Sequence, residues 1–335
     1  MALTSDAEPR SRKDRIRRTV SERIGALRHG LPSPTPEDLR EVTLYLLLLP
    51  FVVAPRAVGL AACRVVARFL MRPGSQYTAL LAGCLPRPIQ LQLGPALPDA
   101  LCVNEMLTEY DKVLVLRALL FPRWERRISV VGLNHLEAAL QRGHGAILWV
   151  HPCVSSHLLV KSAMYRAGFP LVHLSRPGHG FASGSAFGKR LASPLLRRAE
   201  DRYLAERVVI EGGHTIGALR QLRRQLNANR VVSITVAVTA SRVDEILCLG
   251  GRLRLPSGPP ELAAATGAAL LPVFTTGSDS AAQVIIGPPL PINGGTSGAG
   301  AIGECQRAAA SWLEQQALAH PADWVGWRLE QYLQP

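Results

Sequence analysis

The sequence predicts an α/β protein in which helices flank a central sheet and apolar helices lie on its N-terminal side. After residue 126, short apolar runs alternate with segments of helical character, a pattern typical of a sheet covered by helices. The 335 residues, of which 47% are hydrophobic and 19% charged, can bury one large core or two modest ones. Residues 42–54 carry no charge and predict an apolar helix ahead of the sheet.

Three parts follow from composition. Residues 1–34 carry a run of arginines and predict a basic, flexible tail. Residues 35–125 predict a helical region that begins at Thr35-Pro36-Glu37-Asp38, because a threonine cap, an early proline and acidic residues favour a helix start. Prolines and a glycine between residues 76 and 98 predict a loop-rich stretch. Residues 126–335 predict the α/β part.

The uncharged segment 42–54 is too short to span a bilayer, which takes roughly 20 apolar residues. Pro50 interrupts it, and Pro55 and Arg56 close it. Basic residues lie on both sides. Two interpretations remain open: a monotopic anchor in the membrane interface, and a buried core helix.

The α/β part is predicted element by element from its periodicity. Strands and helices alternate over residues 127–131, 136–141, 146–150, 158–167, 171–174, 194–204, 208–210, 215–227, 231–238 and 268–274, after a helical pattern at 105–120.

Net charge narrows the choice of partners. The formal charge of +13 attracts anionic lipid headgroups, nucleic acid or acidic carrier proteins. Only 5% of residues are aromatic, and the cations do not alternate with Phe or Tyr, so the stacking pattern of single-strand nucleic-acid binders is missing. We therefore expect no nucleic-acid partner.

The cysteines predict neither a metal site nor a disulfide framework. The six cysteines are widely spaced without a Cys-x-x-Cys pair, which is typical of reduced thiols in a cytosolic setting. The first thirty residues lack the apolar core of a secretory signal, so we expect the N-terminus to stay on the cytosolic side. No metal is expected.

His151 is the first candidate catalytic residue. It ends the apolar run 145–150, which is bounded by glycines upstream and by Pro152 downstream and predicts a buried strand. Catalytic groups often lie where such a strand of an α/β sheet ends. The alternative is a structural histidine.

Motifs along the chain occur in an order that carries a resemblance. They are Leu49-Pro50, Gly143-His144-Gly145-Ala146-Ile147-Leu148, Ser175-Arg176-Pro177, Gly217-Ala218-Leu219-Arg220, Val231-Val232-Ser233-Ile234, Ser257-Gly258, Leu262-Ala263, Gly267-Ala268, Leu271-Pro272-Val273 and His320-Pro321-Ala322-Asp323-Trp324. From about residue 42 to the C-terminus the chain resembles the bacterial lipid A biosynthesis (lauroyl and myristoyl) acyltransferase family, within the glycerolipid acyltransferase superfamily.

This resemblance implies a mixed central sheet and a peripheral or monotopic place at the cytoplasmic face of the bacterial inner membrane. It implies an acyl thioester donor, on acyl carrier protein or coenzyme A, as co-substrate without a further cofactor. The acceptor would be a hydroxyl or amine of a lipid or other amphiphile, and His151 would be the general base.

The chain departs from the family at the acid that orients this histidine. Five residues after His151, where the family carries Asp or Glu, stands Ser156, which can hold the ring but cannot stabilise the imidazolium. Loss of such an acid in a Ser-His-Asp enzyme costs about 10⁴ in rate. Glu211, Asp244 and Glu245 are candidate substitutes. After residue 236, too, an expected aspartate is missing.

Four further residues are implied as substrate-binding. Arg176 and Arg202 match family arginines that line the site, with solvated surface arginines as the alternative. Ser257 and Gly258 match a substrate-contacting turn, or only shape it. For Ser156 a helix cap is the alternative to a catalytic role, and Cys153 is expected to be a structural thiol.

Two functions remain. The first is an acyltransferase with His151 as base. The second is a catalytically impaired member that serves as a lipid-binding or partner subunit of a lipid biosynthesis complex, which loss of the acids favours.

Overall fold

The computed structural model describes most of the chain. The described ranges are 36–71, 82–121, 128–154, 156–176, 193–210, 215–236, 242–276, 282–292, 298–328 and 331–333. The predicted basic tail, 1–34, lies outside them.

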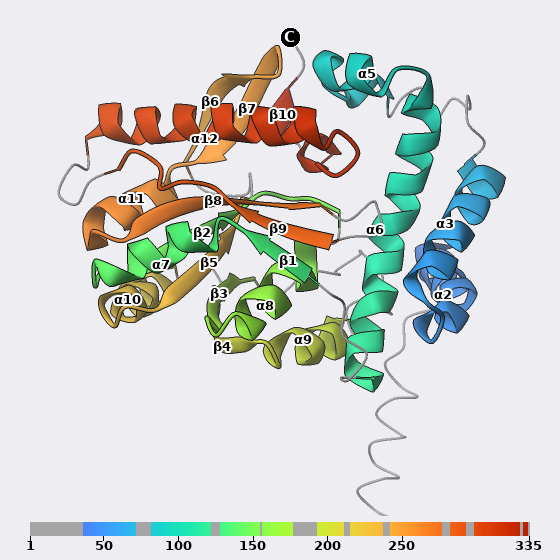
Figure 1. The fold of residues 1–335 in the computed structure, drawn as a ribbon, viewed down its shortest axis with the longest axis horizontal. Coiled ribbons are helices and arrows are strands. Elements are labelled where there is room, and N and C mark those ends of the chain that lie inside the picture. The colour runs from blue at the N-terminus through green and yellow to red at the C-terminus, as the bar shows by residue number, and fades with distance from the viewer. Residues whose placement is uncertain are drawn as a thin grey trace, which may run out of the picture.

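The core of the protein is a seven-stranded mixed sheet, which confirms the predicted α/β class (Figure 1). Its order is β1-β9-β8-β2-β5-β3-β4. The strands are β1 (Ile128–Val131), β2 (Ala146–Val150), β3 (Leu171–Ser175), β4 (Leu204–Val209), β5 (Val231–Thr235), β8 (Ala269–Thr276) and β9 (Ala282–Ile286). Strands β8, β2, β5, β3 and β4 are parallel, while β9 runs antiparallel to β8. β1 pairs in parallel with β9.

Helices cover both faces of this sheet. On one face α7 (Leu133–Gln141) and α8 (Ser156–Arg166) pack against Leu148 and its neighbours. On the other face α10 (Thr215–Asn227), α11 (Gly258–Thr266) and α12 (Ala299–Ala319) pack against Ile147 and Trp149. Figure 1 shows α12 on one side of the sheet and α8 and α9 (Ser193–Asp201) on the other.

Strand β2 lies at the centre of the sheet because its sequence is apolar on both faces. All five of its residues are buried. It begins after Gly145, whose φ of +69° is left-handed and where a Cβ would lie 2.7 Å from the carbonyl oxygen of Arg230. Glycine is therefore required to start this strand. The amide of Gly145 donates to Oδ1 of Asn229 at 2.8 Å.

A second sheet lies beside α12 and was not predicted. It has the order β10-β7-β6, with β6 (Val243–Cys248), β7 (Gly251–Pro256) and β10 (Tyr332–Leu333) all antiparallel. The hydroxyl of Tyr332 donates to the carbonyl oxygen of Leu249 at 2.9 Å. These contacts fasten the C-terminal end of the described chain to the body.

The N-terminal region is helical. It contains α2 (Pro36–Leu48), the 3-10 helix η1 (Leu49–Val52), α3 (Arg56–Met71), α5 (Arg87–Leu93), η2 (Gly94–Ala96) and α6 (Leu97–Leu120). The expected loop over 76–98 is wrong for residues 87–98, which are helical; Pro86 and Pro88 occupy the start of α5, where a missing N–H costs nothing. Figure 1 shows α6 beside the sheet, with α2 and α3 outside it.

The 42–54 segment is buried on one side and exposed on the other. Leu48 and Val52 are buried against Tyr110 of α6 and against Val154 and Val325 of the α/β body. Other large apolar side chains of α2, η1 and α3 are exposed: Leu39, Leu46, Leu47, Leu49, Val53, Val58 and Val65. We call this set the N-terminal apolar face.

Within the described ranges, none of the helices combines the length and the apolar character that crossing a bilayer takes.

Candidate active site

His151 follows the central strand directly. Its backbone amide donates to the carbonyl oxygen of Val273 at 2.9 Å, which continues the pairing of β2 with β8. From β2 the chain passes through α8 to β3, which lies beyond β5 in the sheet. From β5 it passes through β6, β7 and α11 to β8, which lies on the opposite side of β2. The carboxyl ends of β2 and β5 thus form a topological switch point, where open α/β sheets bind their ligands.

Strand register puts Arg176 in one row with His151. Ile147 and Val172 both pair with Val232 of β5, so His151 and Arg176, each four residues further on, lie level at the carboxyl edge. They belong to the same face because side chains alternate along a strand. At a strand spacing of about 4.8 Å, two strands separate them by about 10 Å.

The imidazole of His151 is enclosed by aromatic rings. It is 0% exposed, and its centroid lies 6.2 Å from that of Trp149 and 6.1 Å from that of Trp312 on α12. Neither ring nitrogen has a hydrogen-bond partner in the described part of the chain. Burial disfavours the charged form and lowers the pKa of His151 to about 3. The ring is therefore neutral at pH 7.

The segment after His151 is held by the C-terminal motif that begins at His320. Cys153 and Trp324 form an antiparallel bridge. The amide of Val154 donates to the carbonyl oxygen of Asp323 at 2.8 Å, and the amide of Val325 donates to that of Pro152 at 3.1 Å. Burial raises the pKa of the Cys153 thiol, as expected for a structural cysteine.

Two of the predicted substitutes for the missing acid, Asp244 and Glu245, lie away from His151. Ser156 is the first residue of α8, and its side chain lies outside the described part of the structure, as do Glu211 and residues 237–241. Asp244 accepts a hydrogen bond from Gln306 at 2.9 Å, and Glu245 pairs with Arg252 at 3.0 Å. Both carboxylates belong to the second sheet and neither bonds His151.

The structure separates Arg202 from the other predicted residues. It precedes β4 and therefore lies at the amino edge of the sheet, opposite His151. Its guanidinium donates to the carbonyl oxygens of Ala118 and Leu119, at 3.0 and 3.1 Å, in the last turn of α6. Arg202 thus satisfies carbonyls at a helix end, a common role for arginine, which corrects its predicted place in the site.

Ser257 and Gly258 lie at the start of α11. Because α11 leads back to the amino end of β8, its start lies toward the carboxyl edge, on the side of His151. Ser257 is buried, and its carbonyl oxygen accepts the amide of Glu261 at 3.0 Å. Gly258 is exposed, and a Cβ added to it would meet no atom within 4 Å. A turn-shaping role accounts for these contacts.

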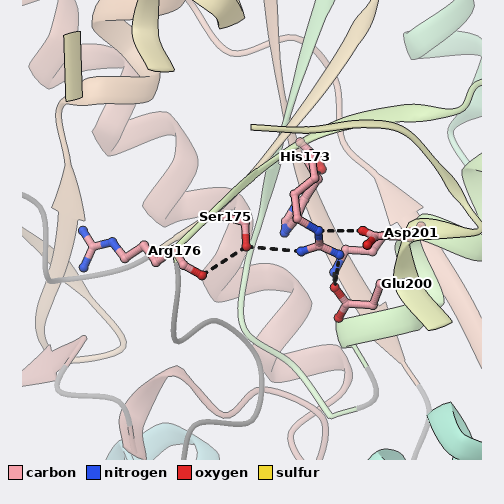
Figure 2. A network of polar contacts seen from close by, with 8 residues as sticks. His173, Ser175, Arg176, Glu200 and Asp201 are labelled. Atoms are coloured by element: carbon pink, nitrogen blue, oxygen red, sulfur yellow. Dashed lines mark hydrogen bonds and ion pairs between the residues drawn. The ribbon is translucent and has the colours of Figure 1, made fainter. Parts of the chain in front are cut away.

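An ion cluster on the opposite face of the sheet, buried except for Asp201, was not predicted (Figure 2). Glu200 of α9 pairs with Lys161 of α8 at 3.1 Å and with Arg207 of β4 at 2.9 Å. Arg207 also pairs with Asp201 at 2.6 Å and donates to the hydroxyl of Ser175 at 3.2 Å. We call these five residues the ion cluster.

The ion cluster contains two cationic and two anionic side chains, so its formal charges balance. Burial lowers the pKa of Lys161 against the opposing effect of Glu200. Burial acts in the same direction on Arg207, but hydrogen bonds and charge from Glu200 and Asp201 outweigh it and raise its pKa. Beside the cluster, Nδ1 of His173 lies 2.8 Å from the hydroxyl of Ser233. In the sequence, the feature that could have indicated this cluster is Lys161, a lysine within the apolar run of α8.

Metal ligands do not gather within the described ranges: no three His, Cys, Asp or Glu side chains there could hold a metal ion together.

Comparison with known proteins gives a distant likeness. No family model matches the chain. Phosphatidylinositol mannoside acyltransferases of two strains of Mycobacterium tuberculosis are 29% identical to it over 289 residues. The matched region covers 80% of this chain and 84% of each relative. This likeness is consistent with the resemblance to lipid A biosynthesis acyltransferases. The chain is thus similar, over four-fifths of its length, to mycobacterial lipid acyltransferases.

Proposed function

We propose that this protein is a lipid acyltransferase that moves a fatty acyl group from a thioester, on acyl carrier protein or coenzyme A, to a hydroxyl or amine of a lipid or amphiphilic acceptor. The observation that carries the proposal is His151: a neutral histidine at the carboxyl end of the central strand, level with Arg176. The names of the mycobacterial relatives support the same reaction class and suggest a glycolipid acceptor.

In the proposed reaction, His151 acts as general base. One ring nitrogen takes the proton of the acceptor hydroxyl as its oxygen attacks the thioester carbonyl carbon. The tetrahedral intermediate collapses, the carbon–sulfur bond breaks, and the imidazolium returns the proton to the leaving thiolate. The products are an ester and a free thiol.

The enclosed ring requires an opening step. A histidine with a pKa of about 3 is a weak proton acceptor at pH 7. Trp312 is only partly buried, so it is the side chain that moves aside when the acceptor enters. Polar groups of the acceptor then solvate the ring, and its basicity rises toward that of an exposed histidine.

The proposed location is the cytoplasmic face of the bacterial inner membrane. The N-terminal apolar face would enter the interface, since exposed apolar side chains bind the boundary between headgroups and acyl chains. Its helices pack against Val154 and Val325, next to the segment that follows His151. The net charge of +13 favours an anionic surface and an acidic carrier protein.

Vesicle sedimentation tests the membrane proposal. We expect wild-type protein to sediment with phosphatidylglycerol-containing vesicles, and a Leu46→Ser/Leu47→Ser variant to sediment several-fold less, because each buried leucine contributes about 2 kcal/mol. Leu247→Ser is the matched control, because Leu247 is 82% exposed but lies on β6 in the second sheet. Equal losses in both variants would contradict the proposal.

A specific observation favours the second candidate function, a lipid-binding or partner subunit with impaired catalysis. In the described part of the chain no carboxylate bonds His151, and Ser156 stands where the family carries the acid. Such a protein would retain the apolar face and Arg176 but would not turn over a thioester.

Acyl transfer by purified protein separates the two functions. Labelled palmitoyl-coenzyme A and palmitoyl-acyl carrier protein are offered with a bacterial lipid extract and with phosphatidylinositol mannoside. We expect product formation that falls at least about 10²-fold in His151→Ala, as expected for loss of a general base. His144→Ala is the control, because His144 is an exposed histidine that lies two residues ahead of the same strand. No turnover in folded wild-type protein would favour the partner subunit.

A further inference from the structure

The ion cluster reaches the candidate site through one hydroxyl. Ser175, the last residue of β3, accepts a hydrogen bond from Arg207 and donates its own proton to the carbonyl oxygen of Arg176 at 3.3 Å. The carbonyl oxygen of Ser175 accepts the amide of Ile210 at 3.0 Å, which fixes the end of β3 to β4. The peptide units on both sides of Arg176 are therefore held, the preceding one by the amide of Ile210 and the following one by the buried Ser175 hydroxyl.

The two sides of this strand end have different surroundings. Ser175 is buried and faces the ion cluster, whereas Arg176 is exposed and belongs to the face of His151. Figure 2 shows the guanidinium of Arg176 extending away from the cluster, with the Ser175 hydroxyl between them. The cluster thus touches the backbone of Arg176, while the guanidinium points to the other side.

We propose that Arg207 and Ser175 are positioning residues for Arg176, which they hold at the carboxyl edge to bind the phosphate of an anionic lipid acceptor. The inference rests on the proposed function, because it takes that acceptor as the ligand of Arg176. Arg207 is itself fixed by two carboxylates, so the Ser175 hydroxyl receives a donor of defined direction. Neither residue touches the substrate.

Ser175→Ala tests this arrangement without removing a buried charge. Binding of dioctanoyl phosphatidylinositol is measured by calorimetry, with phosphate-free dioctanoylglycerol as the reference ligand. We expect Ser175→Ala to weaken binding of the phospholipid about three- to ten-fold, which corresponds to one hydrogen bond. Binding of dioctanoylglycerol should stay unchanged, and Ser175→Thr, which keeps the hydroxyl, should restore phospholipid binding.

Ser233→Ala is the matched control. Ser233 is buried to the same extent, on the neighbouring strand, and its hydroxyl contacts His173 instead of the Arg176 backbone. If Ser175 mattered only for folding, both alanine variants would lose stability and binding alike. We expect the control to bind phosphatidylinositol like wild type.

A double-mutant cycle completes the test. Because Ser175 acts through Arg176, Ser175→Ala should have no further effect on binding once Arg176 is alanine. Additive losses, or a Ser175→Ala variant that binds like wild type, would overturn the positioning role, as would wild-type protein that does not distinguish the two ligands. Binding with the expected pattern but without acyl transfer would refute the proposed enzyme and leave the positioning role standing.

Discussion

Two buried polar sites on the two faces of the central sheet, the ion cluster and His151, differ in their hydrogen bonding. On the α8 and α9 face, Glu200 and Arg207 are paired with several partners, and charges in the ion cluster balance. On the α12 face, His151 is completely buried, yet neither of its ring nitrogens has a partner in the described part of the chain. The side chains of both sites are largely buried against the same parallel strands, so burial alone does not explain the difference in hydrogen bonding.

The hydrogen-bond partners of a buried polar group help to distinguish a structural role from a functional one. A buried polar group that is fully bonded fixes its neighbours, whereas one without a partner lowers stability by about 1–3 kcal/mol. A catalytic role is one reason for which a native protein retains a buried polar group without a partner. This contrast supports a scaffold role for the ion cluster and the proposed role of His151 as the base.

Breaking the ion cluster should have the largest effect on stability. Glu200→Gln leaves Lys161 and Arg207 facing each other without the shared carboxylate. Removing one partner of a buried pair costs about 3–5 kcal/mol. Urea unfolding monitored by tryptophan fluorescence would measure this loss.

The exposed pair between Arg242 and Glu261 supplies the contrast for that measurement. Both side chains are well exposed, and their atoms lie 2.8 Å apart. Glu261→Gln should cost less than about 1 kcal/mol, because solvent screens such pairs. Losses of similar size in the two variants would show that the cluster is not the scaffold of this face.

Acid should weaken the protein through His151. Its folded pKa of about 3 lies below the ordinary 6.5, so between these values the unfolded chain binds a proton that the folded protein does not. The stability that it contributes is complete above pH 6.5 and is lost as pH falls toward 3. From pH 6.5 to 5 the loss is about 2 kcal/mol.

Unfolding of a His151→Leu variant isolates this effect. Between pH 6.5 and 5, the free energy of unfolding of this variant should fall by about 2 kcal/mol less than that of wild type. His144→Leu, an exposed histidine, should follow the wild-type curve. If the free energy of unfolding depends on pH in the same way in wild type and in His151→Leu, the pKa of His151 is the same in the folded and unfolded states, which contradicts this prediction.

At pH 7 the same His151→Leu change should raise the stability, by less than breaking the ion cluster lowers it. Leucine suits a site between the rings of Trp149 and Trp312, and it removes the two imidazole nitrogens that have no partner in the described part of the chain. We expect the free energy of unfolding to rise by about 1–2 kcal/mol. A lower free energy of unfolding would indicate that the ring is bonded and structural.

Local pattern was enough to predict part of the fold. Residues 146–150 and 215–227 form β2 and α10 as predicted, because an apolar run between glycines and a clear helical period leave few alternatives. Strands β6, β7 and β9 were not predicted, since their pairing depends on partners that no local window contains. Nor was α12, which is rich in small residues.

For the candidate site, the sequence predicted where along the chain His151 lies but not what surrounds it. The strand pattern indicated that His151 ends a buried strand, and the register adds that Arg176 is level with it. No pattern predicted the enclosure by Trp312, or an ion cluster assembled from α8, β3, α9 and β4. Arg202 was misplaced because its motif does not record which edge of the sheet it reaches.

The central claim is that His151, which has no hydrogen-bond partner in the described part of the chain, is the base of the proposed reaction and is retained at a cost in stability. Its most direct test compares turnover of palmitoyl thioester by wild type and His151→Leu at pH 7, on samples whose free energies of unfolding are also measured. We predict a variant that is more stable than wild type and inactive in acyl transfer. A variant that retains wild-type turnover would contradict the claim.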